Sequence, residues 1–429
     1  MGSFYTSFVL KGASAEAAQR ALAGRKTVVA RDKSGFIVVF DEEAEDQNDK
    51  LLDDLAAFLS QELQCVVIAF LNHDDSILIY TLYDQGLRKD SYNSNPGYFG
   101  DADQDDEEEG GGEDDDPHPL EPPGGHAATL CAVLPCPSAD QSALERILTA
   151  SSGDEYVFES ERHADLARVL GLPEQLVGFG YTQIASGEMP DEPEGIELLW
   201  SKDVAPNADA RPGYYKVVVP HPTPGEEPIS MPVGWLPATW EKMRAAESDV
   251  SERSRRATAA IRESMEALGF KPIAFHKFVD VLNPNLVDGA GAFYVDEARQ
   301  IFGQIIYHIY AGASGEIESM VCLFRATFPN ETLVCSNQKP SPLASPPNFT
   351  IVREDTPDPL VIFNRFMEEF RTRSEAPEKF ATEELIGTQF DLEAKIVLEE
   401  RVRKGQYVLM NPFEVWRAKQ VRAHCGPRT

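Results

Sequence analysis

Residues 101–116 read DADQDDEEEGGGEDDD and residues 117–125 read PHPLEPPGG, and this stretch decides how the chain divides. Eleven of the first sixteen residues are Asp or Glu, and none is basic. Such a segment buries too little apolar surface to offset the entropy lost on ordering it. We therefore predict a disordered acidic, Pro/Gly-rich linker over residues 101–125. It separates an N-terminal domain of residues 1–100 from the rest of the chain.

The charge of the chain is strongly negative and unevenly distributed. The formal net charge of the 429 residues is −32, with −6 in residues 1–100, −12 in 101–125, −11 in 126–240 and −3 in 241–429. A negative field repels the phosphates of nucleic acids and attracts basic proteins. The charge therefore disfavours nucleic-acid binding, and it leaves two readings open: a basic protein partner or simple solubility.

Residues 1–100 have the pattern of a small α+β sandwich. Strand-like runs of β-branched, aliphatic and aromatic residues alternate with two segments of helical periodicity. The predicted strands are Tyr5–Leu10, Thr27–Ala30, Phe36–Phe40, Cys65–Leu71 and Ile77–Tyr83. One predicted helix begins after the cap Ser14 and ends at Gly24, and a second runs over Asp46–Leu63. The first six elements have the order of a ferredoxin-like split βαβ domain.

The remainder is predicted as three further parts. Residues 126–186 form a small, mostly helical module with a short strand at Tyr156–Phe158. Residues 187–237 form an ordered, Pro-rich connector with strand-like pieces at Ile196–Trp200 and Tyr214–Val219. Residues 238–429 form an α+β domain in which helices cover an antiparallel sheet. Its predicted elements are a long helix over Thr239–Leu268, strands Ile301–Tyr310, Glu316–Phe328 and Thr332–Ser336, a helix capped by Thr356 and Pro357, and a last helix over Glu383–Arg403.

Two parts of the chain carry a resemblance. The run FRATFPNETLVCSN, residues 324–337, resembles a hairpin of uncharacterised bacterial hypothetical proteins with the pattern F-x-T-x-F-x-D-G-x-x-L-x-T-S-N. The N-terminal domain is similar to the same proteins through residues 72–75 (NHDD) and 94–99 (SNPGYF). Asn330-Glu331 stands where that hairpin has Asp-Gly. The resemblance implies a bacterial cytoplasmic protein and no particular activity.

Cysteine usage and hydropathy agree with a cytoplasmic location. The N-terminal sequence MGSFYTSFVLKG lacks the features of a secretory signal, and the longest apolar run, Cys65–Leu71, is too short to span a bilayer. We expect the six cysteines to be free thiols. Cys322 and Cys335 fall on neighbouring predicted strands as diagonal neighbours, about 7–8 Å apart, too far for a disulfide.

No pattern in the sequence indicates a metal or cofactor. The chain has no C-x-x-C and no H-E-x-x-H motif, and it has no phosphate-binding or dinucleotide-binding loop. Asp101, Asp103 and Asp105 match the first three ligand positions of an EF-hand loop. Asp106 and Gly112 then stand where that loop needs Gly and Glu, so we expect no calcium site.

His73, Asp74 and Asp75 are the candidate acid/base residues of the N-terminal domain. A histidine beside two carboxylates gains basicity, which general-base catalysis uses. The three residues also lie between two apolar strands, where a solvated hairpin tip is the favoured reading.

His276 and His308 are the candidate pair of the C-terminal domain. Both fall on predicted strands among aromatic residues, and together with Glu316 or Glu318 they could line a pocket with a general base. The predicted register pairs Glu318 with Ile309, and His308 with Ser319, which does not bring the carboxylate to His308. The favoured reading is therefore two structural histidines.

Three functions follow from these observations. The leading hypothesis is a non-catalytic cytoplasmic protein whose acidic surface binds a basic protein, as inhibitor or immunity-type proteins do. The alternative is an enzyme with a pocket around His276 and His308, and the third is a structural scaffold. We expect no membrane or nucleic-acid partner and assign no oligomeric state.

Overall fold

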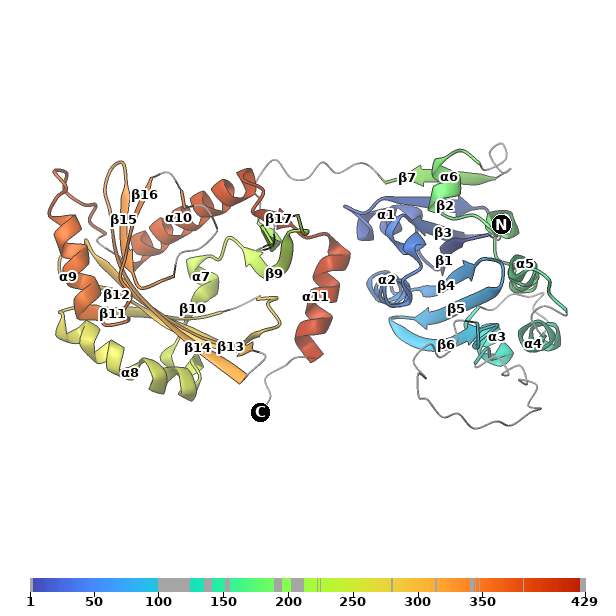
Figure 1. The fold of residues 1–429 in the computed structure, drawn as a ribbon, viewed down its shortest axis with the longest axis horizontal. Coiled ribbons are helices and arrows are strands. Elements are labelled where there is room, and N and C mark those ends of the chain that lie inside the picture. The colour runs from blue at the N-terminus through green and yellow to red at the C-terminus, as the bar shows by residue number, and fades with distance from the viewer. Residues whose placement is uncertain are drawn as a thin grey trace. The chain divides into compact units, whose positions relative to one another are not determined.

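The computed structural model describes residues 3–98, 124–134, 141–150, 155–188, 195–201, 212–221, 223, 225–278, 281–312, 315–339, 343, 345–346, 348–380 and 382–424. The chain folds as two compact units (Figure 1). Unit 1 is Met1–Val204 with Asn411–Trp416, and unit 2 is Ala205–Met410 with Arg417–Thr429. Residues 101–123, which hold the predicted acidic linker and the EF-hand-like aspartates, lie outside the described residues. Both units combine helices with largely antiparallel sheets, so the predicted α+β class is confirmed.

Unit 1 is built on one seven-stranded sheet with the order β6-β5-β4-β1-β3-β2-β7, and all its pairs are antiparallel. The strands are β1 (Tyr5–Lys11), β2 (Thr27–Asp32), β3 (Phe36–Asp41), β4 (Val66–His73), β5 (Ile77–Asp84), β6 (Leu87–Asn93) and β7 (Ile196–Trp200). The predicted strands of residues 1–100 are all present. The inner order β4-β1-β3-β2 is the one that a split βαβ arrangement has.

Helices cover both faces of this sheet, because its central strands are apolar on both sides. α1 (Ala15–Ala21) and α2 (Asp49–Glu62) bury one face. The other face is buried by the helices of the predicted middle module: α3 (Ala127–Val133), α4 (Gln141–Thr149), α5 (Glu159–Leu170), η2 (Glu174–Leu176) and α6 (Tyr181–Ala185). These helices share one core with the sheet, so they are not a separately packed body.

One expectation for this unit was wrong. Tyr156–Phe158 is not a strand: the Tyr156 ring instead covers the Arg162 guanidinium at 4.5 Å, and its hydroxyl donates to Asp165 (3.0 Å). The strand-like piece Ile196–Trp200 of the predicted connector is present as β7, which pairs with β2 along the edge of the sheet. The sequence did not show this partner, because pairing between strands depends on the fold.

Unit 2 contains a seven-stranded sheet of order β10-β11-β12-β13-β14-β15-β16, antiparallel except for β15–β16. Its strands are β10 (Arg244–Ala245), β11 (Lys271–Lys277), β12 (Leu286–Val295), β13 (Phe302–Gly312), β14 (Gly315–Thr327), β15 (Thr332–Ser336) and β16 (Phe349–Arg353). A second sheet has the order β17-β8-β9 and consists of β8 (Gly213–Val219), β9 (Ile229–Leu236) and β17 (Tyr407–Leu409).

Helices lie on both sides of the larger sheet (Figure 1). α8 (Glu252–Ala267) and α9 (Pro359–Phe370) bury one face, while α7 (Trp240–Met243) and α10 (Glu383–Arg403) bury part of the other. α11 (Pro412–His424) is the last helix, and η1 (Glu43–Asp46) and η3 (Glu247–Asp249) are short 3₁₀ turns.

The predicted register of the β13–β14 pair is confirmed. Glu318 lies opposite Ile309, and Ser319 opposite His308. Cys335 pairs with Phe324, so Cys322 is its diagonal neighbour, and both cysteines are buried free thiols as expected. The predicted helix over Glu383–Arg403 has the observed bounds of α10.

The predicted helix over Thr239–Leu268 was wrong. The chain forms α7, a two-residue strand β10 and the turn η3 before α8 begins after the cap Ser251. β10 pairs with β11, so tertiary pairing replaces helix formation there. The cap of α9 was also misplaced by two residues: Asp358 and Pro359, not Thr356 and Pro357, form the cap and first position. Both dipeptides fit the helix-start pattern, and only the fold selects between them.

Candidate functional site

His276 lies inside unit 2 on β11 and has no exposed surface. It sits opposite Gly291 of β12, and a Cβ atom at that position would come within 2.1 Å of His276 Nε2. The glycine therefore makes room for the imidazole. Burial lowers the pKa of His276 to about 4, so the ring is neutral at pH 7. Nδ1 of this ring has no hydrogen-bond partner among the described residues.

His308 lies on the same face of the sheet, across β12 from His276. It sits opposite Gly289, where an added Cβ would meet the Phe278 ring at 2.6 Å. The Phe278 ring stands between the two imidazoles, with ring centroids 5.7 Å from His276 and 4.6 Å from His308. Burial lowers the pKa of His308 as well. The structure therefore brings the predicted pair together, but as neutral rings separated by an aromatic side chain.

The carboxylates Glu316 and Glu318 do not join this pair. They lie on the opposite face of β14, where Arg253 binds Glu316 at 2.7 Å and Glu318 at 2.8 Å. Arg253 lowers the pKa of Glu318, so the carboxylate stays ionised and committed to the arginine. A general base next to a carboxylate, which the enzyme hypothesis needs, is absent from the described residues around His276 and His308.

His73, Asp74 and Asp75 form the hairpin tip between β4 and β5. Asp74 and Asp75 have φ values of 54° and 52°, and Ser76 N–H donates to His73 O (3.0 Å), which defines a two-residue turn of type I′. Asp75 Oδ2 accepts the Ser3 N–H (3.0 Å), and Asp75 N–H donates to Asn72 Oδ1 (3.1 Å). The His73 ring instead contacts Gln47, Nδ1 to Oε1 at 2.5 Å. This geometry is that of a structural turn.

A folded acidic surface in unit 1 was not recognised from the sequence. Residues 41–54, DEEAEDQNDKLLDD, hold eight Asp or Glu residues and one Lys. They run from the end of β3 through η1 into α2. We define the η1 acidic surface as the four exposed carboxylates of this run: Glu42, Glu43, Asp46 and Asp49. The sequence shows this charge density, but residues 101–116 carry more acidic residues and were the only run interpreted as acidic.

Rigid contacts hold the η1 acidic surface in place. Asp41 is buried and accepts two hydrogen bonds from the Arg25 guanidinium, at 2.7 Å and 2.5 Å. Its Oδ1 also accepts the Ala44 N–H (3.0 Å), and Asn48 caps α2 by accepting the Leu51 N–H (2.9 Å). The exposed carboxylates therefore project from a fixed backbone, so a partner would not have to order them.

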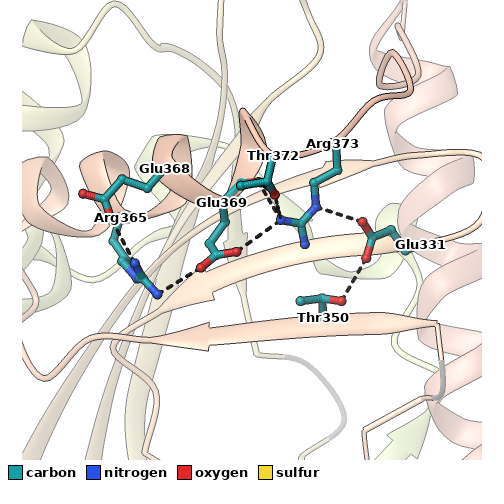
Figure 2. Close-up of polar contacts among 7 residues, drawn as sticks. All are labelled: Glu331, Thr350, Arg365, Glu368, Glu369, Thr372 and Arg373. Carbon is teal, nitrogen blue, oxygen red and sulfur yellow. Dashed lines mark hydrogen bonds and ion pairs between the residues drawn. The ribbon is translucent and has the colours of Figure 1, made fainter.

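An ionic network of unit 2 joins α9 to the edge of the sheet (Figure 2). Arg373 binds Glu331 (2.9 Å) and Glu369 (3.2 Å), and Thr350 of β16 donates to the other oxygen of Glu331 (2.9 Å). Arg365 completes the network through Glu368 and Glu369, at 2.8 Å and 2.9 Å. Arg373 is bound by two carboxylates and Arg365 by three, the third being Glu354 at 3.9 Å, so both guanidinium groups are already paired and the network ties elements together.

Among the described residues, no group of three or more His, Cys, Asp or Glu side chains could hold a metal ion. No helix of the described part is long and apolar enough to cross a membrane. Comparisons of the chain with protein-family models, curated proteins and solved structures found no match.

Proposed function

We propose that this protein binds a basic protein partner through the η1 acidic surface and has no catalytic role. The observation that carries the proposal is the cluster of four exposed carboxylates on a backbone fixed by Arg25, Asp41 and the cap Asn48. Lys26 pairs with Glu42 and Arg25 with Glu43, so the run from Asp41 to Asp54 stays strongly negative. Complementary charge speeds association and selects the partner.

Inhibitor and immunity-type proteins are the concrete class that this chemistry supports, because an acidic surface can occupy a basic active site. The net charge of −32 adds long-range attraction for such a partner. We further propose a cytoplasmic location, a ferredoxin-like identity for the inner strands of unit 1, and kinship with the uncharacterised bacterial proteins that the chain resembles.

An enzyme built around His276 and His308 is the second proposal. The observation in its favour is that both rings lie on one face of the sheet. Full burial of His276 and the distant carboxylates argue against it, since a general base must reach a substrate proton.

The test uses the full chain and a hexa-arginine peptide as a probe of basic partners. The variant E42Q/E43Q/D46N removes three charges from the η1 acidic surface. Its matched control, E155Q/E161Q/E188Q, removes three exposed carboxylates of the same unit outside that surface. Isothermal titration at 50 mM and 200 mM salt gives the affinity of each protein.

We expect the surface variant to bind about tenfold more weakly at 50 mM salt, because each exposed ion pair contributes about 0.2–1 kcal/mol. The control should stay within about twofold, and 200 mM salt should reduce the difference. Equal losses in both variants would mean that total charge alone attracts the peptide, and the η1 acidic surface would then not be the binding site.

A further inference from the structure

A cavity of about 510 Å³ opens in unit 2 between the start of α8 and the strands β11 and β12. Its volume lies in the range of small-molecule sites. Val250 and Ala290 give it an apolar wall, and Arg255, Lys277 and Arg422 line it with positive charge. The site is distinct from the η1 acidic surface, which lies in unit 1.

The cations of this cavity are available for a ligand. Arg255 and Lys277 are exposed, and within the part of the chain that the structure describes neither the Arg255 guanidinium nor the Lys277 ammonium has a hydrogen-bond or ion-pair partner. Arg422 is held at the wall because its Nη1 donates to the main-chain oxygens of Asn283 (3.1 Å) and Leu286. A guanidinium and an ammonium that face one cavity without partners suit an anion with several oxygens.

The carboxylates of the cavity, in contrast, already have donors. Asp288 accepts hydrogen bonds from the hydroxyls of Ser251 and Ser254, the latter at 3.0 Å, and from the Gly289 N–H at 2.8 Å. Asp249 accepts the Ala246 N–H (3.0 Å), and Glu252 is paired with Arg256. The protein thus satisfies its own negative groups here and leaves the charged groups of Arg255 and Lys277 open.

We propose that this cavity binds a small organic phosphate. The phosphate oxygens contact Arg255 and Lys277, and the apolar part of the ligand contacts Val250 and Ala290. The inference goes beyond partner binding and does not depend on it.

The test is isothermal titration of the full chain with phenyl phosphate at constant ionic strength, with inorganic phosphate and phenol as comparison ligands. The variants R255Q and K277Q each remove one cation from the cavity. K271Q is the matched control, because Lys271 is an exposed lysine on the same strand as Lys277 but outside the cavity. Thermal unfolding of each variant confirms that it is folded.

We expect phenyl phosphate to bind the parent protein. R255Q and K277Q should each lower its affinity at least about tenfold, since a charge-assisted hydrogen bond is a strong one. K271Q should change the affinity less than about twofold. E252Q should strengthen binding, because it removes a negative charge from the rim. Phenyl phosphate that does not bind at 10 mM, or that binds R255Q and K277Q as tightly as the parent protein, would overturn the proposal. Phenol or inorganic phosphate binding as tightly as phenyl phosphate would overturn it as well.

Discussion

Acidification should destabilise unit 1 through a single buried histidine, His163. This residue of α5 has 2 % of its surface exposed and stacks on Tyr5 at 5.7 Å and on Phe70 at 4.0 Å between ring centroids. A hydrogen bond of 2.9 Å joins its Nδ1 to the Tyr5 hydroxyl. Burial lowers the pKa of His163 to about 3, because the charged imidazolium would lose its hydration.

The sign and the size of the effect follow from linkage. An unfolded chain holds its histidine at a pKa of about 6.5 and therefore binds a proton, between pH 6.5 and pH 3, that the folded state rejects. The stabilisation from the neutral ring is complete above pH 6.5 and is lost as the pH falls. Between pH 7.5 and pH 5, the free energy of unfolding of unit 1 should fall by about 2 kcal/mol from this group alone.

The assay compares the parent protein with the variant Y5F/H163F across a urea series at pH 7.5 and pH 5. The variant removes the titrating ring and its hydrogen-bond partner together, so no buried polar group is orphaned. Pulsed hydrogen exchange with mass spectrometry reads peptides of β1 and α5, which belong to unit 1, separately from unit 2. Groups other than His163 titrate in both proteins and cancel.

On going from pH 7.5 to pH 5, the free energy of unfolding of unit 1 should fall by about 2 kcal/mol more in the parent protein than in Y5F/H163F. H221Q, which removes a histidine of unit 2, should leave the pH dependence of the unit 1 peptides unchanged. If Y5F/H163F and the parent protein lose the same stability on acidification, His163 is not held neutral by burial, and the reasoning fails.

Three further outcomes are expected. G291A should destabilise unit 2 by about 2 kcal/mol or more in urea denaturation, because the new Cβ would lie 2.1 Å from both His276 Nε2 and Ile305 O, whereas G97A, with no atom within 4 Å, should have little effect. R325M should lower the free energy of unfolding by about 3 kcal/mol, because it leaves Glu393 without its cation; the Glu393 side chain is 5 % exposed and lies 2.6 Å from Arg325. R325M/E393M should recover part of that loss. A double variant no more stable than R325M would contradict this reading. Iodoacetamide at pH 7.5 should alkylate the partly exposed Cys131 before Cys65, Cys322 and Cys335, because burial raises the thiol pKa of each of those three to about 12. Peptide mass spectrometry measures the order of alkylation, and the reverse order would contradict this expectation.

The sequence supported prediction best where local signals agreed with one another. Ser14 caps α1, and the strands of residues 1–100 follow runs of apolar residues bounded by turns. The turn at residues 312–315 was enough to place Glu318 opposite Ile309, and the Pro329-Asn330 turn was enough to place the two cysteines on a diagonal, because a short hairpin turn fixes the register of its strands.

Local signals failed where contacts distant in sequence decide the structure. Arg244–Ala245 lies in a helical pattern but pairs as β10 with β11. The candidate site behaved in the same way. The sequence supplied His276 and His308, but not Gly291, which admits the His276 ring, or Gly289, which admits the Phe278 ring that separates the two histidines.

The sequence by itself determined the acidic balance, the α+β class and most of the elements, because composition and periodicity act over a few residues. Only the tertiary structure decided which charges matter. It fixed Glu42, Glu43, Asp46 and Asp49 on a rigid turn, satisfied the carboxylates around one cavity, and left Arg255 and Lys277 open there. Whether a charge is paired depends on neighbours that folding brings from distant parts of the chain, and no local pattern records them.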